Sequence, residues 1–358
     1  MNERLKNLGF SESYFKEAAL YPEFVLGRIV SQYKDLYRVA TGEREILAEI
    51  TGKMRYSANE ISDYPAVGDF VMIDREEDLH GNAIIHHILP RKSVFTRRAA
   101  GNSQDIQVIA ANIDFIFICM SLNNDFNLRR LERYLSIAWD SGATPVIILT
   151  KADLCHDISV KISEINTIAF GIDILVASAL TEDGYTDILK YISSGQTVAF
   201  VGSSGVGKST LINRLLGEDI VSTREIRQDD KGRHTTTTRE LFIIPGGGAV
   251  IDTPGMRELG LENANVTKTF SDIEELAKSC RFIDCRHEHE PGCAVKQAIE
   301  DGLITEERLN SYRKLSKEAK YENLNSKQIE QEKINSMFSE FNGMKNARDY
   351  IKSKNKNR

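Results

Sequence analysis

The stretch "GSSGVGKST" at residues 202 to 210 limits the possible folds of this chain more than any other feature. It follows the apolar run "QTVAFV" and opens "STLINRLLG", in which apolar residues recur at helical spacing. The pattern G-x-x-x-x-G-K-[ST] between a strand and a helix is typical of a phosphate-binding loop. A strand, a glycine loop and a helix in this order predict a parallel α/β sheet with ligands at the carboxyl ends of its strands.

The residue types of this loop explain how it would hold phosphate. Its glycines let backbone N–H groups surround the anion at the positive end of the helix. Lys208 is predicted to neutralise the β and γ oxygens, and the Ser209 hydroxyl to ligate Mg²⁺. A purely structural glycine turn is the alternative. The expected nucleotide contacts in this segment are Gly202, Ser203, Ser204, Gly205, Val206, Gly207, Lys208, Ser209 and Thr210.

Two later segments are expected to complete a site for Mg²⁺ and a γ-phosphate. "DTPG" at 252 to 255 ends the strand-like "GGGAVI", so Asp252 can reach Mg²⁺ and the Gly255 N–H can sense the γ-phosphate. "GRHTTTT" at 232 to 238 lies where a switch loop must supply a threonine to the metal, and Thr236 or Thr237 is the candidate. The threonine run could otherwise begin an edge strand.

The segment "TKAD" at 150 to 153 ends the strand-like "PVIIL" and is suited to reading guanine. Asp153 can accept hydrogen bonds from N1–H and N2–H₂ of guanine, whereas adenine offers no such donor pair, so a carboxylate here disfavours ATP. The Lys151 stem is expected to cover the base, and the Ala179 N–H to meet O6. The predicted base-binding residues are Thr150, Lys151, Ala152, Asp153, Ser178 and Ala179.

The order of these motifs is reversed relative to an ordinary GTPase, because the base-reading segment precedes the phosphate loop. The strand-like segments occur in the order "FIFICM", "TPVIILTKAD", "DILVASAL", "TVAFVGSSGVGKS", "ELFIIP" and "GAVIDTPG". This order is that of a GTPase sheet cut after its D-x-x-G strand and rejoined elsewhere, which is a circular permutation. A permuted chain can keep its assembled core when the new termini and the rejoined ends are accessible.

A different pattern precedes the α/β unit. Five short strand-like runs between Gly27 and Pro90, separated by turn residues, predict a small closed barrel, most economically an OB-fold. Such barrels often bind nucleic acid through aromatic and basic side chains. The candidates for that role are Arg28, Tyr33, Lys34, Tyr37 and Arg38, and the alternative is that the aromatic residues belong to the core.

Three cysteines and a histidine cluster near residue 285 with the spacing C-x₄-C-x-H-x₅-C. Three thiolates and one imidazole make a full tetrahedral shell for Zn²⁺ with no open position, so the predicted site is structural. His289 could replace the histidine of this set, and Cys119 and Cys155 are expected to be packing residues. The predicted ligands are Cys280, Cys285, His287 and Cys293.

Composition narrows the class of protein. The first residues, "MNERLKNLGF", have no apolar signal region, and no apolar run approaches the roughly 20 residues of a spanning helix. We therefore expect a cytoplasmic protein without a membrane anchor. The net charge of −6 excludes a uniformly basic nucleic-acid binder but permits local basic surfaces, such as the tail at 345 to 358.

Together these motifs resemble one family, the circularly permuted small ribosomal subunit biogenesis GTPases (RsgA, also called YjeQ). The resemblance spans roughly residues 25 to 315 and includes "TKAD", "SAL", "GSSGVGKST", "GRHTTT", "DTPG" and "CRFIDCRHEHEPGC". It implies a multidomain α/β protein that binds GTP or GDP, Mg²⁺ and one structural Zn²⁺. It also implies action on the 30S subunit and 16S rRNA, and we expect a monomer.

The resemblance divides the chain into four expected parts: a helical segment at 1–22, an OB-fold barrel at 23–92, a circularly permuted GTPase domain at 93–260, and a zinc-binding helical domain with a basic tail at 261–358.

The place after the D-x-x-G glycine, where Ras-like enzymes have glutamine, holds Met256, which cannot orient water. We therefore expect slow intrinsic turnover that a partner stimulates, with His234 as the hypothesis for the residue that orients water. Two other functions stay open. One is a GTP-gated RNA-binding module in which hydrolysis is incidental, and the other is a P-loop kinase that uses ATP.

Overall fold

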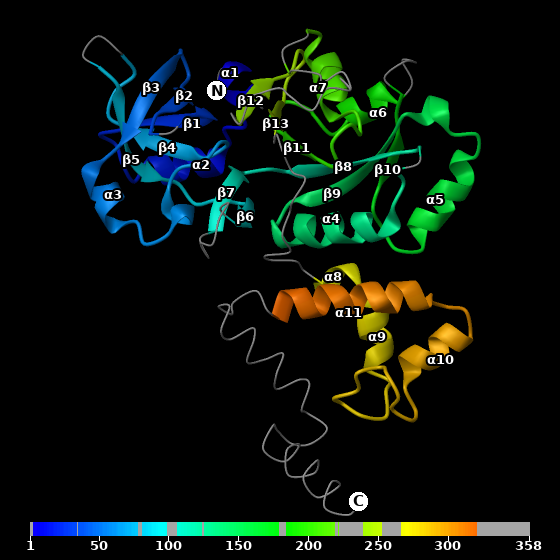
Figure 1. The fold of residues 1–358 in the computed structure, drawn as a ribbon. Helices are drawn as coiled ribbons and strands as arrows, with labels where there is room; N and C mark the ends of the chain where they lie inside the picture. Colours follow the sequence, from blue (N-terminus) through cyan, green and yellow to red (C-terminus); the bar gives the residue numbers. More distant parts are fainter. Residues whose placement is uncertain are drawn as a thin grey trace, which may run out of the picture.

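The computed structural model describes residues 3–33, 35–77, 81–98, 106–123, 125–178, 184–218, 221, 239–252 and 266–320. Figure 1 shows a barrel next to a central sheet with helices on both of its faces, and a helical unit that lies against one of those helices. No helix in the described ranges combines the length and the apolar character needed to span a membrane.

The barrel has the closure that the sequence predicted. Its strands are β1 (Val25–Gln32), β2 (Tyr37–Ala40), β3 (Glu45–Ile50), β4 (Phe70–Ile73) and β5 (Ala83–Ile88). They follow the order β1-β2-β3-β5-β4, and β4 pairs back onto β1, so the sheet closes on itself. The short helices α3 (Gly52–Ser57) and η1 (Ile61–Asp63) lie between β3 and β4. The five strands therefore form a closed, OB-like barrel. Closure pairs each strand of the barrel with a neighbour on both sides.

Two residues expected among the nucleic-acid contacts of the barrel belong to its core instead. Arg28 is fully buried and Tyr37 is 3% exposed, whereas Tyr33 keeps 41% of its surface exposed. The Arg28 guanidinium donates to the Leu8 carbonyl at 2.7 Å and to Thr197 Oγ1 at 2.9 Å. Burial lowers the pKa of Arg28 to about 10. Arg28 therefore joins the N-terminal segment, the barrel and the central sheet, and Lys34 lies outside the described residues.

Short elements connect the barrel to its neighbours. The helices α1 (Glu3–Asn7) and α2 (Glu12–Ala18) precede β1, and the Tyr14 ring of α2 stacks on Phe70 with centroids 3.8 Å apart. After the barrel, β6 (Val94–Arg98) and β7 (Ile106–Ala111) form a separate antiparallel pair. The barrel sheet also continues into the central sheet, because Ser31 of β1 pairs with Glu240.

The central sheet contains β8 (Phe115–Ser121), β9 (Thr144–Thr150), β10 (Ile174–Val176), β11 (Thr197–Val201), β12 (Glu240–Ile243) and β13 (Ala249–Asp252). The strand order is β10-β9-β8-β11-β13-β12. Neighbouring strands are parallel except β12 and β13, which are antiparallel. Because β8 and β11 are adjacent although 75 residues of chain lie between them, the early and late halves of the sequence interleave in one sheet.

Helices cover both faces of this sheet. On one face lie α4 (Leu128–Asp140) and α5 (Ile158–Asn166), and on the other α6 (Tyr185–Leu189) and α7 (Lys208–Leu216). Successive residues of β8 follow this division, since Ile116 and Ile118 share a core with α4 while Phe117 and Cys119 share one with α7. The helices after β8 and β11 therefore pack on opposite faces. Ligands of α/β sheets bind at the carboxyl ends of two neighbouring strands whose following helices diverge in this way.

The C-terminal unit contains α8 (Val266–Thr269), α9 (Ser271–Ala277), α10 (Ala294–Glu300) and α11 (Glu306–Lys320). Over residues 266–320, all of which are described, the structure has helices and no strand. The unit lies against the outer side of α4 (Figure 1). The helix α4 thus has two packed sides, one on the sheet and one on the C-terminal unit.

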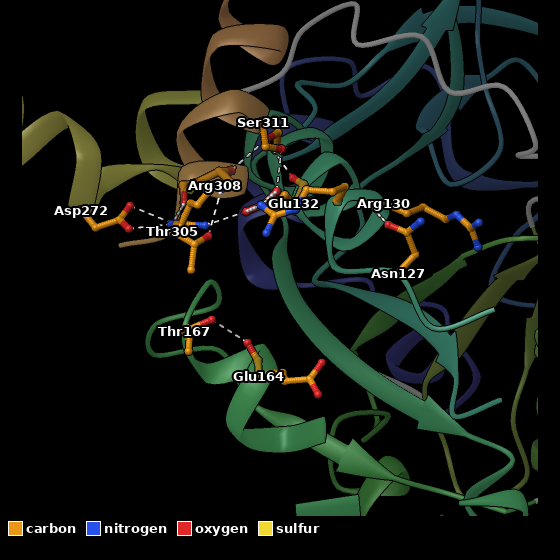
Figure 2. A network of polar contacts seen from close by, with 12 residues as sticks. Asn127, Arg130, Glu132, Glu164, Thr167, Asp272, Thr305, Arg308 and Ser311 are labelled. Carbon is orange, nitrogen blue, oxygen red and sulfur yellow. Dashed lines mark hydrogen bonds and ion pairs between the residues drawn. The ribbon is translucent and has the colours of Figure 1, made fainter. Parts of the chain in front are cut away.

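A buried polar network fixes this contact (Figure 2). Glu132 of α4 is fully buried and accepts a hydrogen bond from Arg308 Nη1 at 2.8 Å and one from Ser311 Oγ at 2.6 Å. Arg308, which is 3% exposed, also donates to both carboxylate oxygens of Asp272, at 2.6 and 2.7 Å. Because each buried charge has a charged partner and further hydrogen bonds, the network tolerates burial that isolated charges would not.

Replacing Arg308 by methionine is expected to lower the stability of the C-terminal unit by about 3 kcal/mol, because Glu132 stays buried after losing a charged partner. The chain's only tryptophan, Trp139, reports on this contact, since Lys268 of α8 lies 3.5 Å from its ring centroid. Urea unfolding followed by tryptophan fluorescence measures the change.

The matched control is Arg133→Met, which removes the half-exposed Arg133–Glu318 pair from the same contact between α4 and α11. An exposed pair contributes at most about 1 kcal/mol. Equal losses in Arg308→Met and Arg133→Met would show that the buried network is not the main anchor.

Candidate functional site

The phosphate loop connects β11 to α7 and follows the carboxyl end of β11. Gly202, Gly205 and Gly207 have φ angles of 148°, 77° and 105°, in the range that favours glycine. At Gly202 an added Cβ would lie 2.5 Å from the Cys119 carbonyl oxygen of the neighbouring strand β8. The loop therefore needs glycine both for its backbone conformation and for its close approach to β8. It ends where α7 begins at Lys208, with the positive end of the helix toward the loop.

Lys208 folds back over this loop. Its Nζ donates to the carbonyls of Gly202 at 2.7 Å and Ser203 at 2.8 Å. The ammonium thus lies at the mouth of the loop, where phosphate oxygens could replace the carbonyls as acceptors. Burial raises the pKa of the Asp252 carboxyl at the end of β13, an effect that the Lys208 charge opposes and Glu240 reinforces. The predicted phosphate-binding lysine and the predicted magnesium-binding aspartate therefore share one electrostatic environment.

The "TKAD" segment meets the phosphate loop directly. Thr150, at the end of β9, is 4% exposed, and its Oγ1 donates a 2.6 Å hydrogen bond to the Val206 carbonyl. The two residues are 56 positions apart in the sequence. Lys151 follows in the left-handed backbone region at φ 56°, a costly conformation for a lysine that is often retained at functional sites. The base-reading and phosphate-binding segments thus form one site.

Asp153 is exposed beside this contact, and one of its carboxylate oxygens is already oriented. Ser178 Oγ donates to Asp153 Oδ1 at 2.6 Å, and Ser178 itself is 2% exposed. The Ala152 N–H also meets the Ala177 carbonyl, at 3.4 Å. A fixed carboxylate that is open to ligand is the arrangement needed to accept the paired N–H donors of guanine.

Several predicted site residues lie outside the described ranges, so their roles stay predictions. They are Ala179, His234, Thr236, Thr237 and Gly255, together with Met256.

The Cys/His cluster assembles as the sequence predicted. One ligand atom from each of Cys280, Cys285, His287 and Cys293 lies within 4.8 Å of the others. The Cys280 and Cys293 sulfurs are 3.9 Å apart, and His287 Nδ1 is 3.6 and 3.3 Å from them. A tetrahedral zinc site with Zn–S bonds of about 2.3 Å places its sulfurs about 3.8 Å apart, so the donor set and its spacing are compatible with Zn²⁺.

The same geometry distinguishes His287 from the alternative, His289, which is not part of the cluster. His287 is 6% exposed, has a left-handed backbone with φ 60°, and has its Nδ1 close to the Cys280 and Cys293 sulfurs. Cys293 has a second role, because its sulfur accepts the Lys296 N–H and caps α10. The other two cysteines, Cys119 and Cys155, lie outside the cluster.

Two residues near the phosphate loop were missed from the sequence. Asp125, in the connection after β8, accepts the Ser203 hydroxyl at 2.6 Å, and Arg130 of α4 donates to both of its carboxylate oxygens. One signal was available, because polar residues after a strand of a parallel sheet lie at its ligand-binding edge. The pairing with Ser203 spans 78 residues and is not visible in a local pattern.

Comparisons with known proteins agree with this geometry. The RsgA GTPase family model matches residues 88–262. A protein of Lactiplantibacillus plantarum named small ribosomal subunit biogenesis GTPase RsgA 2 is 54% identical over 325 residues, which cover 90% of this chain and 92% of that protein. This chain belongs to the RsgA GTPase family. An RsgA of Methanosarcina acetivorans is 44% identical over 88% of this chain and 86% of its own length.

Two solved structures show the same fold. YjeQ from Thermotoga maritima superposes with a TM-score of 0.61 at 28% identity, covering 83% of this chain and 98% of that one. YloQ, described as a circularly permuted GTPase, has a TM-score of 0.59 at 26% identity and coverages of 83% and 95%. The interleaved sheet and the order of its motifs therefore confirm the circular permutation predicted from the sequence.

An ABC transporter model also matches, at residues 185–340. This range contains the strand, loop and helix around Lys208, a unit that many nucleotide-binding proteins share. It leaves out the barrel and the "TKAD" strand, which the RsgA relatives cover. The assignment to the RsgA family is therefore supported by similarity over nearly the whole chain.

Replacing Thr150 by valine is expected to weaken guanine nucleotide binding about fivefold, because one hydrogen bond worth about 1 kcal/mol joins this residue to Val206. Serine at the same position keeps the hydroxyl and should bind like the wild type. Titration of a fluorescent GDP analogue measures both variants. Equal affinity of the valine and serine variants would show that the hydroxyl does not matter.

Proposed function

We propose that this chain is a GTP hydrolase that acts in the late maturation of the small (30S) ribosomal subunit. The observation that carries the proposal is the hydrogen bond from Thr150 to Val206, which unites a guanine-reading segment with a phosphate loop. It occurs in a chain whose relatives, at up to 54% identity, are named small ribosomal subunit biogenesis GTPases.

The nucleotide would lie across the carboxyl ends of β8 and β11. Asp153 accepts the N1–H and N2–H₂ donors of guanine, and the backbone from Gly202 to Thr210 surrounds the phosphates. Ser209 and Asp252 would hold Mg²⁺, with Thr236 or Thr237 as a third ligand. The metal neutralises charge on the phosphates when it is bound. The support for these roles is the position of each described residue at the carboxyl ends of the strands.

Hydrolysis depends on positioning more than on covalent chemistry. Lys208 moves from the loop carbonyls to the phosphate oxygens, and the Gly255 N–H senses the γ-phosphate. Since Met256 cannot orient water, basal turnover is slow, and His234 supplies this function when a partner is bound. Full stimulated turnover in His234→Ala would dismiss this role.

The Cys₃His cluster holds one Zn²⁺ in a structural role. Three thiolates and the His287 ring fill all four tetrahedral positions, which leaves none for water or substrate. This cluster stabilises the C-terminal unit. We propose that the unit belongs to a domain at 261–358, which three other parts precede, at 1–22, 23–92 and 93–260.

The names of the relatives identify the small ribosomal subunit as the partner. We propose contact with its 16S rRNA through the barrel and the C-terminal unit, action as a monomer, and a cytoplasmic location, where ribosomal subunits mature.

One experiment tests substrate and partner together. Turnover of GTP and of ATP is measured with and without purified 30S subunits, for the wild type and for Lys208→Ala. We expect slow GTP hydrolysis that the subunits stimulate, little ATP hydrolysis, and loss of both GTP rates in the variant. Subunit maturation that proceeds normally with Lys208→Ala would favour the RNA-binding module instead, and equal use of ATP would favour a kinase.

A further inference from the structure

A polar cluster joins Ser203, a predicted nucleotide contact, to two residues that were not predicted to contact the nucleotide, and it holds the phosphate loop from the side. Asp125 lies in the connection from β8 to α4, and Arg130 lies in the first turn of α4. The Ser203 hydroxyl donates to Asp125 Oδ2 at 2.6 Å. Arg130 Nη1 donates to both Asp125 oxygens at 2.8 Å and approaches Ser203 Oγ at 3.3 Å. Each of the three side chains thus contacts the other two.

The cluster is anchored on a rigid element. Asn127 caps α4 by accepting the Arg130 N–H at 3.0 Å, which fixes the turn from which the Arg130 side chain extends (Figure 2). Two residues further along the same helix, Glu132 joins α4 to the C-terminal unit. Because α4 is held on both sides, the cluster presents a fixed hydrogen-bonding partner to the more irregular loop that contains Ser203.

The surroundings of Asp125 favour the negatively charged form of its carboxyl group. Burial alone would raise the pKa of its carboxyl, but the hydrogen bonds from Ser203 and Arg130 and the charges of Arg130 and Lys151 outweigh that effect and hold the pKa below its usual range. The carboxylate thus contacts the phosphate loop through Ser203, and the charge of Lys151 in the "TKAD" segment contributes to its low pKa.

The role of the cluster follows from what Lys208 must do. Its ammonium now bonds the carbonyls of Gly202 and Ser203, and phosphate oxygens must take over these bonds when nucleotide arrives. The loop backbone then loses two of its internal contacts. The side chain of Ser203 stays bonded to Asp125, so the loop keeps its shape while Lys208 changes partners.

We propose that Asp125 and Arg130 are positioning residues that hold the phosphate loop in its anion-binding shape through Ser203. This inference rests on the proposed function and adds residues that do not themselves contact the nucleotide. The loop surrounds phosphates that GDP and GTP share. Loss of the Asp125 or Arg130 side chain therefore weakens the binding of both nucleotides by the same factor and leaves the rate constant for hydrolysis of bound GTP unchanged.

An isosteric pair of variants isolates the hydroxyl. Ser203→Thr keeps the donor to Asp125, whereas Ser203→Val replaces it with a methyl group of the same shape, so any steric strain is common to both. We expect Ser203→Val and Asp125→Ala, which removes the acceptor, to weaken GDP and GTP binding about tenfold, the worth of one hydrogen bond to a charged group. Ser203→Thr should bind within about twofold of the wild type.

The double variant Ser203→Val/Asp125→Ala should bind no more weakly than either single variant, because both substitutions remove the same contact. Arg130→Gln should weaken binding less, by at most about fivefold, because the Arg130–Asp125 pair is more than a third exposed. The matched control is Arg133→Gln on the same helix, since Arg133 has the same 36% side-chain exposure as Arg130 but pairs with Glu318 of α11. It should leave nucleotide affinity unchanged.

Fluorescent GDP and GTP analogues measure the affinities, and single-turnover hydrolysis measures the rate constant for hydrolysis of bound GTP. Cooperative melting of the nucleotide-free variants within about 3 °C of the wild type excludes general unfolding. Equal affinity of Ser203→Thr and Ser203→Val, or a loss confined to GTP, overturns the inference. If Ser203→Val does not fold, Asp125→Ala decides by the same criteria. A wild-type chain that binds neither GDP nor GTP overturns the proposed function itself.

Discussion

Cys280→Ser is expected to abolish zinc binding and to unfold the segment between α9 and α10. The sequence between Cys280 and Cys293 has no core of its own, since Phe282 is 41% exposed and Ile283 is fully exposed. The buried side chains of this segment are the ligands His287 and Cys293. Ligation by a Cys₃His set can supply on the order of 10 kcal/mol to such a segment, and little else is available to fold it.

Two readouts measure this effect. Elemental analysis should find one zinc per wild-type chain and less than about a tenth of that in Cys280→Ser, because a site with three ligands binds far more weakly. Trypsin should cleave after Arg281 and Arg286 in the variant but not in the wild type. Cys155→Ser is the matched control, because Cys155 lies outside the cluster. A Cys280→Ser chain with full zinc content and unchanged trypsin resistance would show that the cluster is not a zinc site.

Acid should have the same effect as the substitution. Zinc binding requires thiolates and a neutral imidazole, so protons compete with the metal for the same atoms. The site that the Cys₃His set forms is therefore expected to lose zinc as the pH falls, and the sequence between Cys280 and Cys293 to become protease-sensitive over the same range.

The sequence predicted best the parts that local chemistry determines. The phosphate loop, the "TKAD" segment and the zinc ligands each combine particular residue types at fixed spacing, and the structure brings the described members of each set together. The closed barrel was also predictable, because short strands with turn residues between them leave few alternatives.

The misassignment of Arg28 has a physical reason. Residues 27 to 31 of β1 are all buried, so the strand lacks the alternation that would show which face is exposed. The buried Arg28 has hydrogen-bond acceptors that are distant in sequence, at Leu8, Gly68, Asn112 and Thr197. No local pattern reveals partners of this kind.

The same limit explains what was missed around α4. Glu132 and Arg308 are 176 residues apart, and Ser203 and Asp125 are 78 apart. In the sequence alone, each of these four residues looks like an ordinary charged or polar surface residue. Their pairing becomes visible only when the sheet and the C-terminal unit position α4 between them.

The base preference of Asp153→Asn tests most directly the claim that "TKAD" and the phosphate loop grip one guanine nucleotide. A carboxylate accepts both N–H donors of guanine, whereas an amide donates to the C2 carbonyl of xanthine and accepts only N1–H. We therefore expect Asp153→Asn to lose on the order of 100-fold in GDP affinity and to bind XDP better than GDP.

Titrations with GDP, XDP and ADP compare the wild type, Asp153→Asn and the control Asp187→Asn. Asp187 lies on α6 and forms an exposed ion pair with Lys190. The account predicts that GDP binds best to the wild type and to the control, that XDP binds best to Asp153→Asn, and that ADP binds poorly to all three. An Asp153→Asn chain that binds GDP as tightly as the wild type would contradict it.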